Sequence, residues 1–339
     1  MTRLADFTTL RLGGSASTWV EASAEAAFIS ALAAADDAGQ DVLILGGGSN
    51  LVVADEGFDG TVIRVATTGI SSAHDARVPT GGEVIVTVAA GETWDTFVAH
   101  AVASGWVGVE ALAGIPGTVG ATPIQNVGAY GQEVGQTITH VRVWDRRLKG
   151  VRTFAASECG FGYRWSRFKA DPGRHAILSV TFGFQTAPLS APIAYAELAR
   201  TLGVEVGERA PLEQVRNAVL GLRRGKGMVL DAEDHDTWSA GSFFTNPFVD
   251  VAPEGAPAYP QPDGRVKTSA AWLIERAGFS KGHGNAVVSL STKHTLALTN
   301  RGEARTVDLL VLAREIRDGV TATFGIELQP EPIFVNCSL

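Results

Sequence analysis

The sequence predicts a multidomain protein in which helices and strands are mixed. Its 339 residues are enough for two or three domains. Segments with alternating apolar residues, typical of strands, are interleaved with segments of helical periodicity along the chain. Between them lies a long loop, residues 113–133, whose glycines and prolines exclude a helix or a central strand. Its single charged residue is Glu133, so the loop is too apolar for a disordered linker.

This glycine-rich loop has the composition of a ligand-binding segment. It contains Thr118, Thr122, Gln125 and Asn126 among its glycines. Backbone N–H groups at close range, together with small polar side chains, suit a large and partly anionic ligand such as a dinucleotide pyrophosphate. The alternative is an ordinary surface loop, but loops of this length without a function are uncommon.

Composition excludes several classes of protein. The net charge of −8 argues against a general nucleic-acid binder. Cys159 and Cys337 are far apart, which is typical of reduced thiols, and no metal-ligand spacing is present. The first residues lack the apolar segment of a signal peptide, and no window has the apolar length of a transmembrane helix. We therefore expect a cytoplasmic enzyme that does not insert into a membrane.

The periodicity predicts the elements in chain order. Helices are expected at 23–38, 93–104, 195–206, 211–222, 267–277 and 305–324. Strands or extended segments are expected at 8–20, 42–45, 51–53, 82–90, 138–146, 151–155, 176–185, 239–247, 292–300 and 326–335. The acidic residues after 225 are interpreted as a solvated loop: Asp231, Glu233, Asp234 and Asp236.

A second glycine segment, Gly46–Asn50, follows a short buried strand. A dinucleotide-binding Rossmann unit would continue into a helix at this point. Here β-branched residues follow, and Gly57 and Gly60 would interrupt any helix. The segment is therefore predicted to be a glycine turn between two strands, with a purely structural hairpin as the alternative.

Six motifs then occur in an order that resembles one enzyme family. They are LILGGGSN (43–50), IPGTVGATPIQNVGAYGQE (115–133), ECGFGYRWSRFK (158–169), AGSFFTNP (240–247), KTSAAWLIERAGF (267–279) and LQPEPIF (328–334). Nearly the whole chain is similar to the UDP-N-acetylenolpyruvoylglucosamine reductase family, flavoenzymes of bacterial peptidoglycan synthesis. Thr245 stands where some members carry lysine.

The resemblance implies an α+β fold. It consists of a two-part FAD-binding region of the PCMH type, as in the vanillyl-alcohol-oxidase group, and a smaller α+β substrate-binding domain. The expected boundaries are 1–70 and 71–185 for the two FAD-binding subdomains and 195–325 for the substrate domain, with 326–339 packing back on the first. The subclass implied is the one in which a tyrosine-bearing loop closes over the nucleotide.

The resemblance also implies the cofactor and its contacts. FAD is expected to lie against two segments rich in glycine and small polar residues: Gly46, Gly47, Gly48, Ser49, Asn50, Gly117, Thr118, Gly120, Thr122, Gln125, Asn126, Gly128, Ala129 and Tyr130. Neither segment contains a histidine, so FAD is expected to be bound non-covalently. NADPH is implied as co-substrate.

Three residues match the family's catalytic positions. Arg164 would stabilise an enolate, Ser242 would donate a proton to it, and Glu331 would act beside the substrate carboxylate. For the UDP-sugar, the resemblance points to Tyr163, Tyr195, Lys226 and Asn246. The protein is expected to be a monomer.

Three other interpretations remain open at the level of sequence. An FAD-dependent oxidase of alcohols or hydroxy acids would use the same fold. A non-catalytic UDP-sugar-binding protein would be expected to lack Arg164 or Ser242, and both are present. A structural protein without a ligand would leave the uncharged loop unexplained.

Overall fold

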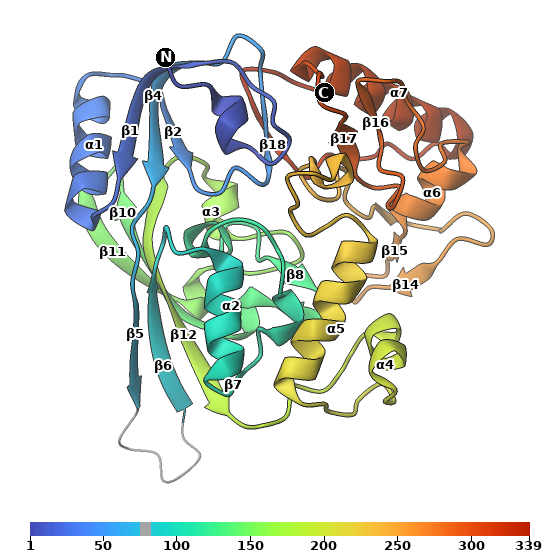
Figure 1. The fold of residues 1–339 in the computed structure, drawn as a ribbon, viewed down its shortest axis with the longest axis horizontal. Helices are drawn as coiled ribbons and strands as arrows, with labels where there is room; N and C mark the ends of the chain where they lie inside the picture. Colours follow the sequence, from blue (N-terminus) through green and yellow to red (C-terminus); the bar gives the residue numbers. More distant parts are fainter. Residues whose placement is uncertain (75–82) are drawn as a thin grey trace. The chain divides into compact units, whose positions relative to one another are not determined.

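A computed structural model describes residues 1–74 and 83–339. Figure 1 shows the course of the chain through its helices and strands. Contacts within the chain divide it into two compact units. The first comprises Met1–Ala16, Gly48–Phe58 and Gly225–Leu339, and the second comprises Ser17–Gly47 and Asp59–Arg224. The expected three-part division at 1–70, 71–185 and 195–325 stays a prediction.

The second unit is built on a six-stranded antiparallel sheet with the order β11-β10-β12-β6-β5, and β7 pairs with β12 beside this path. Valines 84, 86 and 88 of β6 are buried in alternation, as a half-buried strand requires. Phe97 of α2 packs on Phe182 of β12, with ring centroids 4.9 Å apart. The strands are β5 (Ile70–His74), β6 (Glu83–Ala89), β7 (Trp106–Val107), β10 (Ile138–Asp145), β11 (Gly150–Ala155) and β12 (His175–Thr186).

A smaller sheet with the order β1-β4-β2 accompanies the helix α1 (Glu25–Asp37). Its strands are β1 (Ala16–Ala22), β2 (Val42–Leu45) and β4 (Phe58–Val65). Gly39 has a φ of +65° and ends α1, because few residues other than glycine adopt this conformation at low cost. After β2 the chain turns and enters β3 (Leu51–Val53). The predicted strand, glycine turn and strand are confirmed, and no Rossmann helix begins at Asn50.

The first unit has its core around α7 (Thr306–Phe324) and α6 (Ala270–Arg276). The hairpin of β16 (Val288–Leu290) and β17 (Leu298–Asn300) packs against α7. The C-terminal strand β18 (Ile333–Val335) pairs in parallel with β3. A further sheet contains β13 (Phe248–Val249), β14 (Ala258–Pro260) and β15 (Val266–Thr268).

The remaining helices are α2 (Trp94–Ala103), α3 (Arg167–Ala170), α4 (Ala196–Leu202) and α5 (Leu212–Gly225). The 3-10 turns are η1 (Leu4–Phe7), η2 (Glu110–Leu112), η3 (Val119–Ala121), η4 (Val134–Gln136), η5 (Ala156–Glu158) and η6 (His235–Thr237). The central loop also contains the short strands β8 (Gly128–Ala129) and β9 (Gln132–Glu133). None of the helices in residues 1–74 and 83–339 has the length and apolar character needed to cross a membrane.

Two predicted strands are wrong over most of their length. Segment 239–247 is irregular because Phe243 bonds to two separate segments, donating to Leu296 and accepting from Glu331. Segment 292–300 is a strand only from Leu298, because a turn closed by Ser291 N–H and Ala297 O precedes it. The predicted strand 82–90 is observed as Glu83–Ala89, and its residue 82 lies outside the described residues.

Candidate functional site

The two predicted cofactor segments of the second unit touch each other through glycine. A Cβ atom on Gly47 would lie 2.6 Å from the Cα of Gly117, and one on Gly46 would lie 2.6 Å from Thr118 Oγ1. Real Cβ atoms do not approach other atoms this closely, so the contact requires glycine at both positions. The result is a cradle of two bare backbones that are seventy positions apart in the sequence, since 117 − 47 = 70.

The rest of the Gly46–Asn50 segment belongs to the first unit. Gly48 has a φ of +60°, and a Cβ atom there would lie 1.9 Å from Phe7 O. The N–H of Thr9 donates to Gly48 O at 3.2 Å. These contacts fix the turn from the side of the first unit and again demand glycine.

Backbone hydrogen bonds hold the central loop to residues 90–92. Val119 N–H donates to Glu92 O at 2.9 Å, and Gly120 N–H donates to Ala90 O at 2.8 Å. The buried Thr122 hydroxyl donates to Val119 O at 2.8 Å. Because these donors are used inside the protein, fewer backbone N–H groups face a ligand than the composition suggested. The assignment of Gly120 and Thr122 to FAD stays a prediction.

Asn126 is also engaged by the protein. It is 2% exposed and has a φ of +46°. Its amide nitrogen donates to Glu133 Oε2 at 2.7 Å and to Gly162 O at 3.1 Å. Its amide oxygen accepts from Gly135 N–H at 2.9 Å. The side chain therefore joins the central loop to the segment that carries Arg164.

Arg164 lies in a tight turn formed by residues 162–165, where the backbone groups of Gly162 and Trp165 bond to each other at 3.0 and 3.1 Å. Its φ of +51° is unusual for a residue with a side chain. Arg164 Nη2 donates to Gly128 O at 3.1 Å, and the guanidinium carbon lies 5.5 Å from the centre of the Tyr163 ring. The structure thus brings Arg164 and Tyr163 to the glycine-rich loop.

The predicted substrate tyrosine also meets this loop. The rings of Tyr130 and Tyr195 are 5.5 Å apart at 89°, an edge-to-face contact. A Cβ atom on Gly131 would lie 2.7 Å from Ala194 Cβ. Tyr195 is 47% exposed, so its ring keeps a surface for a ligand.

In the first unit, the backbone brings Ser242 beside Glu331. Glu331 N–H donates to the carbonyl of Phe243, the next residue after Ser242, at 2.9 Å. The side chain of Asn50 donates to Glu331 O at 3.4 Å, and Ile333 N–H donates to Asn50 O at 2.9 Å. Three segments from distant parts of the sequence therefore meet here, and each carries a predicted site residue.

The two other predicted substrate residues of the first unit lie elsewhere in its secondary structure. Asn246 Oδ1 accepts from Ala270 N–H at 2.9 Å, at the start of α6. Lys226 is half-buried and follows the end of α5. The structure gives Asn246 a structural partner, and its contact with a nucleotide stays a prediction.

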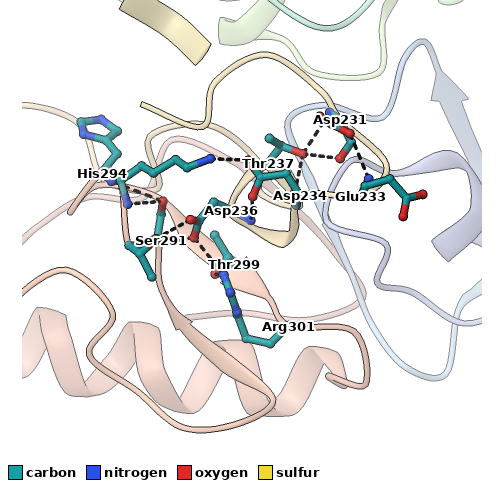
Figure 2. Close-up of polar contacts among 11 residues, drawn as sticks. Asp231, Glu233, Asp234, Asp236, Thr237, Ser291, His294, Thr299 and Arg301 are labelled. Atoms are coloured by element: carbon teal, nitrogen blue, oxygen red, sulfur yellow. Dashed lines mark hydrogen bonds and ion pairs between the residues drawn. The ribbon is translucent and has the colours of Figure 1, made fainter. Parts of the chain in front are cut away.

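The interpretation of the acidic segment as a solvated loop is wrong for Asp236 (Figure 2). Asp236 is 4% exposed and accepts from Thr292 N–H and from Arg301 Nη1, both at 2.9 Å, and from the Thr292 hydroxyl. Burial of the carboxylate would raise its pKa, but the hydrogen bonds from Thr292 and Arg301 outweigh it, so the pKa of Asp236 is lowered. Asp234 pairs with Lys293, whereas Asp231 and Glu233 are exposed as expected.

This charged network supports the segment that carries Ser242. Asp236 binds Thr292, and the same turn of the chain offers Leu296 O, which accepts from Phe243 N–H at 2.7 Å. Thr9 Oγ1 donates to the carbonyl of Ser239 at 2.6 Å. Asp236, before Ser242, and Phe243, after it, are therefore both bonded to residues 292–296, and Thr9 adds a third anchor at Ser239. The sequence gives no local signal for this, because Asp236 and its partners are far apart along the chain.

Comparison with known proteins shows the general class to which this chain belongs. A family described as "FAD binding domain" matches residues 16–151. The glycine cradle fits this cofactor, because the contact of Gly47 with Gly117 brings bare backbone from two segments to one place, and backbone N–H groups are suited to bind a pyrophosphate. The chain is therefore a flavoprotein with an FAD-binding fold of the PCMH type and mixed helices and strands, which confirms the predicted fold and cofactor.

The particular family follows from the rest of the chain. A family described as "UDP-N-acetylenolpyruvoylglucosamine reductase, C-terminal domain" matches residues 233–335. Proteins named UDP-N-acetylenolpyruvoylglucosamine reductase are similar, at 56% identity in Cutibacterium acnes (99% of this chain, 90% of the relative) and 54% in Streptomyces avermitilis (99% and 94%). The crystal structure of the enzyme from Thermus caldophilus matches with a TM-score of 0.67 and 25% identity, covering 98% of this chain and 97% of that one. The chain belongs to the UDP-N-acetylenolpyruvoylglucosamine reductase family, as the motifs predicted.

Proposed function

We propose that this protein reduces the enolpyruvyl ether of UDP-N-acetylglucosamine to UDP-N-acetylmuramate, with NADPH as reductant and FAD as carrier, in cytoplasmic peptidoglycan precursor synthesis. The observation that carries the proposal is the backbone contact that places Ser242 beside Glu331 in a chain of this family. Both residues match the catalytic positions of the family, and a protein that only bound a nucleotide would need neither a proton donor nor a carboxylate at this place.

The reaction adds a hydride and a proton across one C=C bond. FAD, when bound, takes the hydride from NADPH and supplies it to the terminal carbon of the substrate. The electron pair of the broken π bond then lies on the adjacent carbon and its carboxylate. The protein must stabilise this enolate and protonate it.

Arg164 would bind the enolate and its carboxylate through parallel N–H donors, which a planar guanidinium presents at fixed spacing. Ser242 would donate its hydroxyl proton to the adjacent carbon. A serine hydroxyl is a weak acid, so this transfer needs both a strongly basic carbon and a fixed hydroxyl. The anchors on both sides of Ser242 hold its backbone, which supports the second condition, and Glu331 would act beside the substrate carboxylate.

The remaining predicted residues would hold the ligands. Gly46, Gly47 and Gly117 would lie against FAD, bound without a covalent link. Tyr163, Tyr195, Lys226 and Asn246 would contact the UDP-sugar. The exposed ring of Tyr195, supported by Tyr130, is a suitable lid for a nucleotide. We propose a monomer with small-molecule ligands and no nucleic-acid partner.

The test is an anaerobic absorbance experiment on the purified protein. NADPH should bleach the flavin band, and the enolpyruvyl substrate should restore it without oxygen. Recovery only on admission of air would favour the oxidase alternative. A flavin that NADPH does not bleach, or a protein that cannot be loaded with FAD, would exclude the proposed reaction.

A further inference from the structure

We propose that Asn126 and Glu133 are positioning residues for Arg164, and that the Asn126 side chain acts on this arginine and not on the cofactor. The inference rests on the proposed role of Arg164. Asn126 lies at the junction of the glycine-rich loop and the turn 162–165. Both segments belong to the second unit.

The chemistry of the junction requires an amide. Its two donor contacts are Glu133 Oε2 and Gly162 O, and its acceptor contact is Gly135 N–H. Among side chains of this size, only asparagine combines two N–H donors and an acceptor in one plane. A Cβ atom at Gly135 would lie 2.8 Å from Asn126 Oδ1, so the partner must be glycine as well.

The contacts form a closed ring through Arg164. Asn126 Nδ2 holds Gly162 O, which lies two residues before Arg164. Arg164 Nη2 in turn holds Gly128 O, two residues after Asn126. A Cβ atom on Gly128 would lie 3.5 Å from Arg164 Nη1, so the guanidinium rests directly on this glycine. Both the backbone and the head group of Arg164 are therefore fixed by the loop around Asn126.

Glu133 sets the direction of the amide. It is the only charged residue of segment 113–133, and its carboxylate accepts from Asn126 at 2.7 Å. A carboxylate attracts the NH₂ end of an amide and repels the oxygen. This contact keeps the nitrogen toward Gly162 O, and the positive φ of Arg164 stays fixed because its surroundings define it from two sides.

The experiment compares Asn126→Asp with Asn285→Asp, which makes the same substitution at an exposed position. Among residues 1–74 and 83–339, the Asn285 side chain bonds only through its amide oxygen, which accepts from the N–H groups of Val287 and Val288, so aspartate can replace it without loss of these bonds. At position 126, aspartate keeps the acceptor but loses both donors and adds a charge beside Glu133. FAD content, flavin bleaching by NADPH and anaerobic reoxidation by substrate are measured separately in stopped flow.

We expect Asn126→Asp to keep its FAD and its rate of bleaching, and to slow reoxidation by roughly 10²-fold, as a displaced catalytic group does. Glu133→Gln keeps an acceptor oxygen and should slow reoxidation only a few-fold, whereas Glu133→Ala should approach the effect at 126. The control should match wild type in all three measurements. Combining Asn126→Asp with Arg164→Lys should slow reoxidation little beyond the slower single variant, because both act through one group.

Loss of FAD from Asn126→Asp, with normal reoxidation of the loaded fraction, would show a cofactor contact and overturn the inference. Fully multiplicative effects in the double variant would also overturn it. If Asn126→Asp does not fold, Glu133→Ala and its double variant with Arg164→Lys decide in the same way. Wild-type reoxidation in Arg164→Lys would instead contradict the proposed role of Arg164, which separates the two failures.

Discussion

The segments that carry Arg164 and Ser242 are fixed by different physical means. In the second unit, Arg164 is held by backbone carbonyls and by the neutral amide of Asn126. In the first unit, the Ser242 segment is held through the ionised Asp236 and its partners Thr292 and Arg301. The Arg164 segment is thus held mostly through neutral groups, with the Glu133 carboxylate acting through Asn126, whereas the Ser242 segment depends on an ion pair between the buried Asp236 and the partly exposed Arg301.

The difference has a consequence for stability. Hydrogen bonds between neutral groups change little with pH, whereas a buried ion pair fails when its acid is protonated or removed. The support of Ser242 should therefore be the more sensitive to charge substitution. The support of Arg164 should be the more sensitive to added side-chain atoms, since a Cβ atom at Gly128 or Gly135 would collide with its neighbours.

The largest effect is expected for Ser242→Ala. Removal of a positioned proton donor should slow flavin reoxidation by substrate by roughly 10²–10⁴-fold. Bleaching by NADPH should stay near the wild-type rate, because this half-reaction needs no proton from Ser242. Anaerobic stopped flow measures the two halves separately. Equal loss in both would mean that Ser242 supports the structure and donates no proton.

Arg164→Lys is expected to have the second largest effect, with reoxidation slower by roughly 10²-fold. Lysine keeps the charge but cannot bridge two oxygens or reach Gly128 O in the same geometry. The measurement is the same stopped-flow assay at saturating substrate, with Arg167→Lys in the neighbouring helix α3 as a control. Unchanged reoxidation in Arg164→Lys would remove the arginine from the mechanism.

The sequence predicts the glycine cradle at 46–47 and 117–118 better than it predicts the network at Asp236. The glycine cradle leaves a local signature, because the close contact of 46–47 with 117–118 admits no side chain at Gly47. The network at Asp236 leaves none, because Thr292 and Arg301 lie 56 and 65 positions away. A run of acidic residues is usually solvated. Here Asp236 is buried by residues distant in the sequence, which local periodicity does not reveal.

The same reason explains the strand predicted at 239–247. Its apolar residues suggested a strand, but Phe243 and Phe244 are adjacent and both are buried, which a strand with one buried face does not allow. Phe243 bonds to residues from two other parts of the chain, Leu296 and Glu331. Motif resemblance predicts site residues on this segment, whereas local pattern could not give its conformation.

Asp236→Asn is expected to destabilise the first unit by about 2 kcal/mol, the order expected when hydrogen bonds to a charged group are weakened beside the partly exposed Arg301. The substitution keeps the shape and one acceptor oxygen, so the loss reports the charge on Arg301 and the contact with Thr292. Hydrogen exchange of residues 231–247 measures it, because local opening exposes these amides. Glu233→Gln, an exposed neighbour, is the matched control and should change nothing.

The smallest expected effect is the dependence of this same segment on acid. The pKa of Asp236 is lowered by folding, so its stabilising contribution is complete above the unfolded pKa of about 3.9 and is lost as the pH falls through the lower folded value. The opening free energy of residues 231–247 in wild type should therefore fall as the pH drops below about 4. In Asp236→Asn this component should be absent, so the two curves should converge in acid. Parallel curves would show that the carboxylate is not the group that ties the Ser242 segment to the charge state of the protein.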